Sequence, residues 1–280
     1  MDKSFSQIKT VFLNELAFTP RKIAISVTFV FFCLLWGFAF KGLIELDEFI
    51  KTDNSEKSGL FLGFLMWFLD IDPTQWLEFQ KNGVFFISFG ILSLLTTHYF
   101  VIIMTSDQTA SEIGNRYFRY LITRCGRTEI FLGRLLASLT LGLVAITLTG
   151  ITAWGVDCYL NQTTSIDSVL FVISTCFWVF WFCLPFVCLC SMISAWSGSV
   201  ATSMLCSMSL AFLLPKVFNV IELRWKKVEG IKELREYFPG NFTHSVLLDH
   251  ASISNLLVPL VYASLFVWVG RSIFKRREFP

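Results

Sequence analysis

Charged residues are scarce in this chain, where Lys, Arg, Asp and Glu together occupy only 16% of the 280 positions. No charged residue occurs between Ser168 and Pro215. A water-soluble chain of this length keeps charged residues over most of its surface. The shortage of charge, combined with 54% hydrophobic residues and 31 phenylalanines, excludes a soluble globular protein and indicates a protein embedded in a lipid bilayer.

Common sequence signatures of catalysis are also missing. The chain contains no GxxxxGK[ST] phosphate-binding loop, no HExxH zinc motif and no GxSxG nucleophile motif. Among the three histidines, His98 lies within an apolar run, where we expect a hydrogen-bonded packing residue rather than a proton relay or a ligand. We therefore expect no catalytic residue, no metal site and no cofactor bound by this chain.

The cysteines do not form a ligand cluster. Six of the eight lie inside apolar runs, where thiols behave as small hydrophobic groups: Cys33, Cys176, Cys183, Cys188, Cys190 and Cys206. Cys188 and Cys190 are two positions apart, a spacing that directs them to different sides of a helix. We expect all six to pack against neighbouring apolar side chains.

Apolar runs long enough to cross a membrane recur along the chain. About 20 apolar residues in a helix cross about 30 Å of hydrocarbon. We predict six spans, over residues 23–40, 83–105, 130–156, 169–193, 200–214 and 251–270. The turn-forming residues from Ser194 to Ser199 separate spans four and five. The expected fold is an all-α polytopic membrane protein, with residues 23–280 forming one six-helix transmembrane domain.

Residues 1–22 precede the first span and show helical amphipathicity. Apolar residues recur every three or four positions, at Phe5, Ile8, Phe12 and Leu16. This stretch is too short to cross a bilayer, so we predict an N-terminal helix lying flat in the cytoplasmic interface. The alternative is a frayed N-terminus. Residues 59–69 form another short apolar stretch, for which we expect an interfacial or re-entrant helix.

The distribution of charge predicts the topology. With both termini inside, the cytoplasmic segments contain 13 of the 23 Lys and Arg residues but only 6 of the 21 Asp and Glu residues. Basic residues accumulate on the cytoplasmic side of membrane proteins. We therefore predict a multi-pass protein of a bacterial inner membrane with both termini in the cytoplasm. In this topology residues 216–250 form a helical outer loop. The side chain of Arg134 is expected to extend towards the membrane surface.

The segment from Ser106 to Arg134 contains five arginines between spans two and three. Glu112 and Arg116 are four positions apart and can pair on one face of a helix, and Gly126 predicts a stop before the next helix. An arginine-rich cytoplasmic helix of this kind favours docking of a partner. The alternative is an ordinary basic loop that only fixes topology.

The run RYLITRCGRTEIFLGRLLA, residues 119–137, resembles the signature of type-2 permeases of ABC transporters. That signature has an acidic residue, a leucine pair, an arginine and a Gly-Lys pair. The matching residues are Glu112, Leu121 with Ile122, Arg127, and Gly133 with Arg134. The chain departs from the pattern at Asn115 and Arg116, where the family has Gly-Thr, and at Arg124, where it has proline.

The resemblance implies that this chain is the membrane subunit of a transporter. Two permease copies would pair as a homodimer, and each would dock a separate ATPase subunit through the cytoplasmic coupling helix between spans two and three. ATP and magnesium would be bound by the ATPase, and family members can carry an accessory protein on the outer face. The residues expected to contact the ATPase are Glu112, Arg116, Arg119, Arg124, Arg127 and Glu129.

We expect an exporter whose pathway lies between the two copies, lined by spans one, two and five. Aromatic residues and the lack of charge within the spans favour an amphipathic or lipid-like cargo over a small ion. The sequence gives no indication of nucleic-acid binding. One alternative is a membrane anchor or assembly scaffold that binds a cytoplasmic partner without transport. A proton-coupled carrier would require buried acids or broken helices, which the sequence does not indicate.

Overall fold

The computed structural model describes residues 2–18, 23–52, 84–107, 109–110, 121–161, 166–224 and 253–277, and these residues form helices joined by short turns. The seven long helices in this part of the chain are α1 (Asp2–Phe18), α2 (Ile23–Thr52), α5 (Val84–Ser106), α8 (Arg127–Asn161), α9 (Ile166–Ser197), α10 (Val200–Arg224) and α13 (Ile253–Arg276). The prediction of an all-α fold is confirmed for these residues.

Four of the described helices are long and apolar enough to cross a bilayer. Their qualifying stretches are Ile25–Glu45 in α2, Arg127–Leu160 in α8, Ser168–Ser197 in α9 and Leu256–Arg276 in α13. The described parts of α5 and α10 contain shorter apolar stretches, Leu92–Ser106 and Val200–Leu213. All six predicted spans thus coincide with helices, and four of these helices have the length and composition of a membrane crossing.

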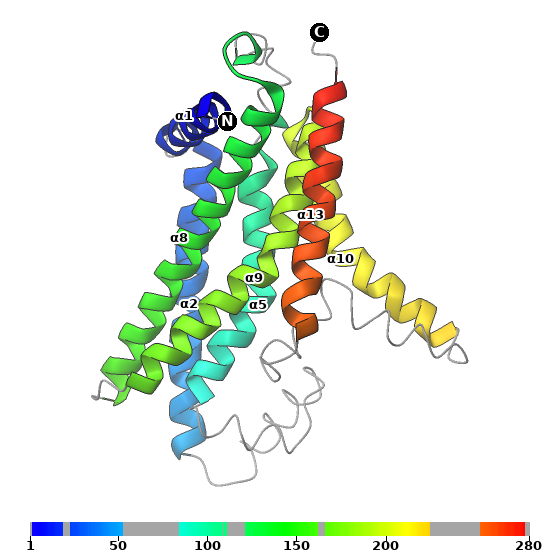
Figure 1. The fold of residues 1–280 in the computed structure, drawn as a ribbon. Coiled ribbons are helices and arrows are strands. Elements are labelled where there is room, and N and C mark those ends of the chain that lie inside the picture. The colour runs from blue at the N-terminus through cyan, green and yellow to red at the C-terminus, as the bar shows by residue number, and fades with distance from the viewer. Residues whose placement is uncertain are drawn as a thin grey trace.

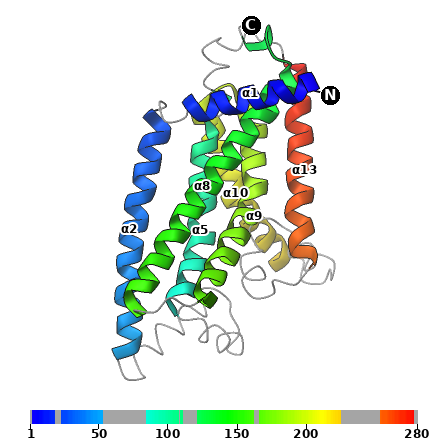
Figure 2. The ribbon, with the colours of Figure 1, turned by 60° about the vertical axis from the view of Figure 1, so that its left-hand side comes forward.

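Helix α9 occupies the centre of the bundle and packs against α5, α8, α10 and α13 (Figure 1). Helix α2 packs mainly on α5. Helix α1 runs across one end of the bundle and packs on the first turns of α8 (Figure 2). The two chain termini lie at this same end (Figure 1). Because α9 packs against four other helices, a displacement of α9 reaches most of the bundle.

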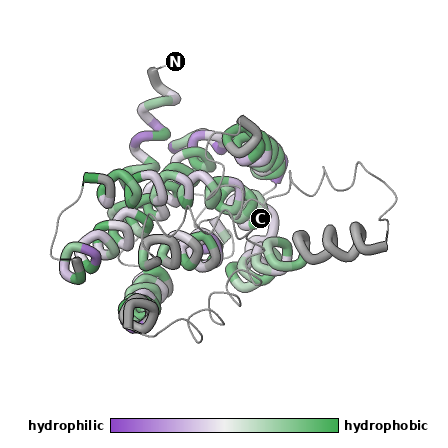
Figure 3. Tube along the Cα trace, turned by 90° about the horizontal axis from the view of Figure 1, so that it is seen from below, coloured by the Kyte–Doolittle hydropathy of each residue, from purple (hydrophilic) through white to green (hydrophobic). Residues whose placement is uncertain are grey.

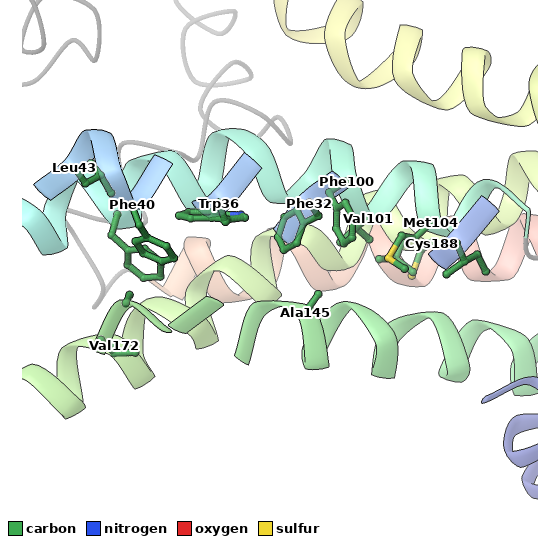
Figure 4. Close-up of a cluster of buried hydrophobic side chains, with 14 of the residues drawn as sticks. Phe32, Trp36, Phe40, Leu43, Phe100, Val101, Met104, Ala145, Val172 and Cys188 are labelled. Carbon is green, nitrogen blue, oxygen red and sulfur yellow. The ribbon is translucent and has the colours of Figure 1, made fainter. Parts of the chain in front are cut away.

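Aromatic side chains form the contact between α2 and α5 (Figure 4). The rings of Phe32 and Phe100 stack with their centroids 3.8 Å apart, and Trp36 lies 5.5 Å from Phe89. Phe40 also stacks on Phe89. Lipid tails are as apolar as the side chains, so burial of apolar surface does not drive two helices together in a bilayer. Close packing of these aromatic rings therefore stabilises the contact between α2 and α5. Each such pair contributes about 0.5 to 1.5 kcal/mol beyond its buried area.

The helices extend beyond the predicted spans. Helix α2 continues to Thr52, and an ion pair between Lys41 and Glu45, one turn apart, lies in this extension. Helix α8 begins before and ends after the predicted span, and α10 continues to Arg224. The predicted bounds of a span are set by the first charged residues on either side. The helix itself can continue past these residues into water, where side chains one turn apart can pair. The first part of the predicted outer loop at 216–250 thus belongs to α10, whereas residues 225–250 and the predicted short helix at 59–69 lie outside the described residues.

The turn predicted between spans four and five is confirmed. Helix α9 ends at Ser197 and α10 begins at Val200, and Gly198 between them has a φ of 66°. This left-handed conformation is strained for residues with a side chain but accessible to glycine. The turn therefore needs a glycine at this position.

The outer faces of the bundle are apolar. Hydrophobic residues predominate along the bundle helices, whereas hydrophilic residues are frequent along α1 (Figure 3). Large apolar side chains are exposed on several helices, among them Phe38 on α2, Leu148 on α8 and Val261 on α13. A soluble protein rarely exposes apolar surface on this scale. These faces fit contact with lipid tails.

Candidate functional site

The described parts of the connection between α5 and α8, residues 107, 109–110 and 121–126, lie at the end of the bundle crossed by α1. A helical turn at Leu121 and Ile122 ends in a reversal, in which the backbone N–H groups of Arg124 and Cys125 donate to the Leu121 carbonyl at 3.1 and 3.0 Å. The Gly126 carbonyl then accepts the hydrogen bond from Ile130 N–H that starts α8. The helix stop predicted at Gly126 is therefore confirmed.

Polar side chains of α1 bind this connection. Ser4 Oγ donates to Glu129 Oε1 at 2.8 Å, and Gln7 Nε2 donates to the Arg124 carbonyl at 3.3 Å. Ser4 and Gln7 lie on one side of α1, since residues three apart in a helix are neighbours. The side of α1 that faces the connection is thus polar at its N-terminal end.

The same side of α1 packs closely on α8 further along. Gly133 faces Val11 and the Ile8 carbonyl so closely that a Cβ atom there would lie 2.9 Å from Val11 Cβ and 3.0 Å from that oxygen. One residue later, Arg134 is 2% exposed and forms an ion pair with Glu15 at 3.7 Å. The prediction that Arg134 extends to the membrane surface is wrong, because α1 covers this side chain and provides its carboxylate partner.

The contact of α1 with α8 is centred on Val11 rather than on the predicted apolar stripe, in which Ile8, Phe12 and Leu16 are half-buried. Phe5 is 71% exposed, whereas Val11, outside the stripe, is buried against the bundle. Leu13 is also exposed. Helix α1 therefore packs on the bundle through one side and leaves Phe5 and Leu13 exposed, while its position in the membrane interface stays a prediction.

Two arginines connect the ends of α8, α9 and α13. Arg127 Nη1 donates to the Lys275 and Arg277 carbonyls, each at 2.8 Å. Arg277 Nη1 donates to the Ala195 and Trp196 carbonyls, each at 2.6 Å. These carbonyls lie at the C-terminal ends of α13 and α9, where a cation satisfies orphan acceptors and complements the helix dipole. Partial burial lowers the pKa of Arg277, but the guanidinium stays charged at neutral pH.

Ser194 joins α9 to the beginning of the connection. Its Oγ accepts from the backbone N–H groups of Thr109 and Ala110, each at 3.1 Å, and lies 2.8 Å from Thr109 Oγ1. A hydroxyl oxygen has two lone pairs, so once both accept backbone donors its own hydrogen is free to donate to Thr109 Oγ1. All three residues are buried, at 1% exposure or less.

Replacing Ser194 by alanine is expected to lower the free energy of unfolding by about 1 to 2 kcal/mol, because two buried N–H groups lose their acceptor. Thr109→Val should cost less, since Ser194 Oγ keeps both backbone donors in that variant. Denaturant unfolding in detergent compares the two. An equal loss of stability in both variants would show that the hydrogen bond between the Ser194 and Thr109 hydroxyls, rather than the bonds from the two backbone N–H groups, provides the stabilisation.

The predicted partner-binding residues divide into two groups. Glu112, Arg116 and Arg119 lie outside the described residues. Of the others, the Arg124 side chain is exposed, while Arg127 and Glu129 bind α13 and α1 within the chain. Sequence reasoning did not find the remaining members of the site, which are Ser4, Gln7, Ser194 and Arg277. The acceptors of Arg277 are backbone carbonyls, which leave no trace in a sequence.

His98 behaves as the packing interpretation predicts. It is buried in α5, its Nδ1 donates to the Leu94 carbonyl at 2.8 Å, and its ring contacts Phe182 and Phe186. A buried acid that the span prediction did not include, Asp157, lies in the extension of α8. The described residues bring no three potential metal ligands together.

Two serines of span five face inward. Ser203 and Ser207 of α10 are fully buried and, together with Thr105 of α5, surround the Cys190 thiol of α9. Small residues at these positions allow the three helices to approach closely. Within one copy of the chain these serines serve helix packing. Cys183 and Cys188 are also buried among apolar side chains.

Comparison with known proteins adds no relative to this description. No protein-family model matches the chain, and no curated protein is significantly similar to it.

Proposed function

We propose that this chain is the transmembrane permease subunit of an ABC transporter, driven by a separate ATPase that docks on the connection between α5 and α8. In this proposal α5 and α10 complete six membrane spans, and both termini lie in the cytoplasm at a bacterial inner membrane. The chain pairs with a second copy and exports its cargo between the two copies, past α2, α5 and α10. The ATPase holds the ATP and magnesium.

The observation that carries this proposal is the set of hydrogen bonds between the connection and the helix ends around it. Ser194 attaches the beginning of the connection to α9, and Gln7 attaches Arg124, close to its end, to α1. Arg127 attaches its end to α13. A force applied to the connection therefore acts on three helices together, as a subunit driven by ATP-dependent closure requires.

The exposed side chain of Arg124 leaves a basic group at this end for a partner. Charged residues at the edge of an interface set its register and speed association. Because α9 packs against four other helices, motion that enters at its C-terminus reaches most of the bundle. A simple basic loop that only fixes topology needs none of these attachments.

Photo-cross-linking from position 124 tests the proposal. A photoreactive phenylalanine analogue at Arg124 is expected to trap a protein that contains a phosphate-binding loop, with a yield that changes when ATP is added. The matched control is the same analogue at Tyr159, which is 82% exposed at the opposite end of α8. This position should not trap the ATPase.

Two outcomes would contradict the proposal. Trapping of the same protein from both positions would place the ATPase contact elsewhere. A partner trapped at position 124 with a yield independent of nucleotide would instead favour the membrane scaffold, which binds a cytoplasmic protein without being driven by it.

A further inference from the structure

Helix α13 has an inward side and an outward side. It lies at the edge of the bundle, packs mainly on α9, and ends at the end of the bundle crossed by α1 (Figure 1). On its inward side, Gly270 faces Met192 of α9, and Phe274 is buried with its ring 6.0 Å from that of Phe131 of α8. Residues on the other side of α13 therefore face the surroundings of the bundle.

The outward side of α13 is apolar along most of the helix. Leu257, Val261, Leu265 and Trp268 are all exposed, and Trp268 is 69% exposed. These residues are three or four positions apart, so they form one stripe. From Leu257 to Trp268 a helix rises about 16 Å, close to half of the roughly 30 Å of hydrocarbon in a bilayer. The stripe therefore has the length of one leaflet, with Trp268 at one end of it.

Basic residues continue the same stripe beyond Trp268. Arg271 follows Trp268 by three positions and Lys275 follows Arg271 by four, and both side chains are exposed. Neither side chain forms an ion pair with another residue that the structure describes. Acidic residues are absent from 168–215 and 251–277, which contain nearly all of α9 and the whole of α13. The two cations therefore lack a nearby carboxylate on their own helix and on the helix that packs behind it.

This arrangement is complementary to a phosphate group at the edge of the hydrocarbon. Tryptophan is enriched at the boundary between lipid tails and headgroups, so Trp268 marks the depth at which the headgroups begin. Arg271 and Lys275 lie one turn apart, close enough to approach one phosphate together. A guanidinium binds phosphate through two parallel hydrogen bonds, and an ammonium binds it as a point charge. Ser272 adds no contact, because its hydroxyl already donates to the Trp268 carbonyl at 2.9 Å.

We propose that Arg271 and Lys275 bind the headgroup phosphate of an anionic phospholipid in the leaflet at the α1 end of the bundle, with an acyl chain along Val261 and Leu265. A zwitterionic headgroup fits less well, because its own cation offsets the attraction to the two side chains. An acidic protein segment also fits less well, because the cations are continuous with an apolar stripe of the length of a leaflet. The proposal requires insertion into a bilayer but does not require transport.

Native mass spectrometry of lipid binding tests the site. The full chain in detergent is titrated with phosphatidylglycerol or with phosphatidylcholine of the same acyl chains, and the bound fraction of each lipid is measured. Each Lys or Arg near an anionic membrane surface contributes about fivefold in affinity, so the double variant Arg271→Gln, Lys275→Gln should weaken phosphatidylglycerol binding about 10- to 25-fold and phosphatidylcholine binding less than about twofold. Glutamine is a good helix former, so α13 should keep its helix. Unchanged phosphatidylglycerol binding, or an equal loss for both lipids, would overturn the proposal.

Two single variants separate a defined site from general attraction to positive charge. Arg276 is also exposed, but one position along a helix turns its side chain about 100° away from Lys275. Arg276→Gln should therefore weaken phosphatidylglycerol binding less than Lys275→Gln does, and equal weakening would mean that a diffuse positive field attracts the lipid. Arg271→Lys keeps the charge and should retain most of the binding. A loss as large as in Arg271→Gln would refute the ionic contact with the phosphate.

Discussion

Replacing Gly133 by leucine is expected to detach α1 from α8 and to lower the free energy of unfolding by about 3 kcal/mol. A side chain at this position meets Val11 Cβ at 2.9 Å and the Ile8 carbonyl at 3.0 Å already at its first carbon. Overpacking of a close contact costs about 1 to 3 kcal/mol when neighbours can shift. Here one neighbour is backbone, which cannot rotate away, so the cost should reach the upper end of that range.

Detachment has a second consequence because Arg134 is covered by α1. Once α1 moves away, the ion pair with Glu15 separates and the Arg134 side chain becomes exposed, so the stabilisation that this pair provides is lost. Cleavage by trypsin after Lys9 should become faster as α1 loosens. Denaturant unfolding in detergent measures the change in stability. The rate of trypsin cleavage and the free energy of unfolding together distinguish detachment of α1 from general unfolding.

The matched control is Gly155→Leu on the same helix. A Cβ atom at Gly155 meets nothing within 4 Å, so leucine there should be neutral or should stabilise α8 by up to about 1 kcal/mol through its helix propensity. An equal loss of stability in both variants would show that loss of glycine in α8, rather than contact with α1, causes the effect.

The sequence predicted the helices well because their signal is local. Apolar length marked each of the six predicted spans, and the turn residues up to Ser199 marked the hairpin between α9 and α10. The ends of helices were less predictable. Hydropathy reports where lipid contact stops, whereas helix α2 continues beyond that point to Thr52 through polar residues that remain good helix formers.

The arrangement around the connection could be predicted only in part. Its arginines and the stop at Gly126 were visible in the sequence, but their partners were not. Arg277 binds backbone carbonyls, which every residue possesses, and Arg134 binds Glu15, which is far away in the chain. Such pairs become visible only when the path of α1 across the bundle is known.

Replacing Arg277 by methionine is expected to release the C-terminal end of α9 from α13 and, under the proposed function, to reduce ATPase stimulation by cargo at least tenfold. Methionine keeps an apolar stem but cannot donate to the Ala195 and Trp196 carbonyls. Hydrogen bonds from a charged donor contribute about 1.5 to 3 kcal/mol each, and partial exposure reduces this, so stability should fall by about 3 kcal/mol.

Two further variants separate geometry from charge. Arg276→Met removes the neighbouring charge, which is exposed, and should leave both stability and stimulation nearly unchanged. Arg277→Lys retains the positive charge but replaces the planar guanidinium by a single ammonium group, so it should recover only part of the loss. Full recovery with lysine would mean that charge near the end of α9 suffices. Full activity of Arg277→Met would mean that the contact between α13 and α9 does not transmit force from the connection.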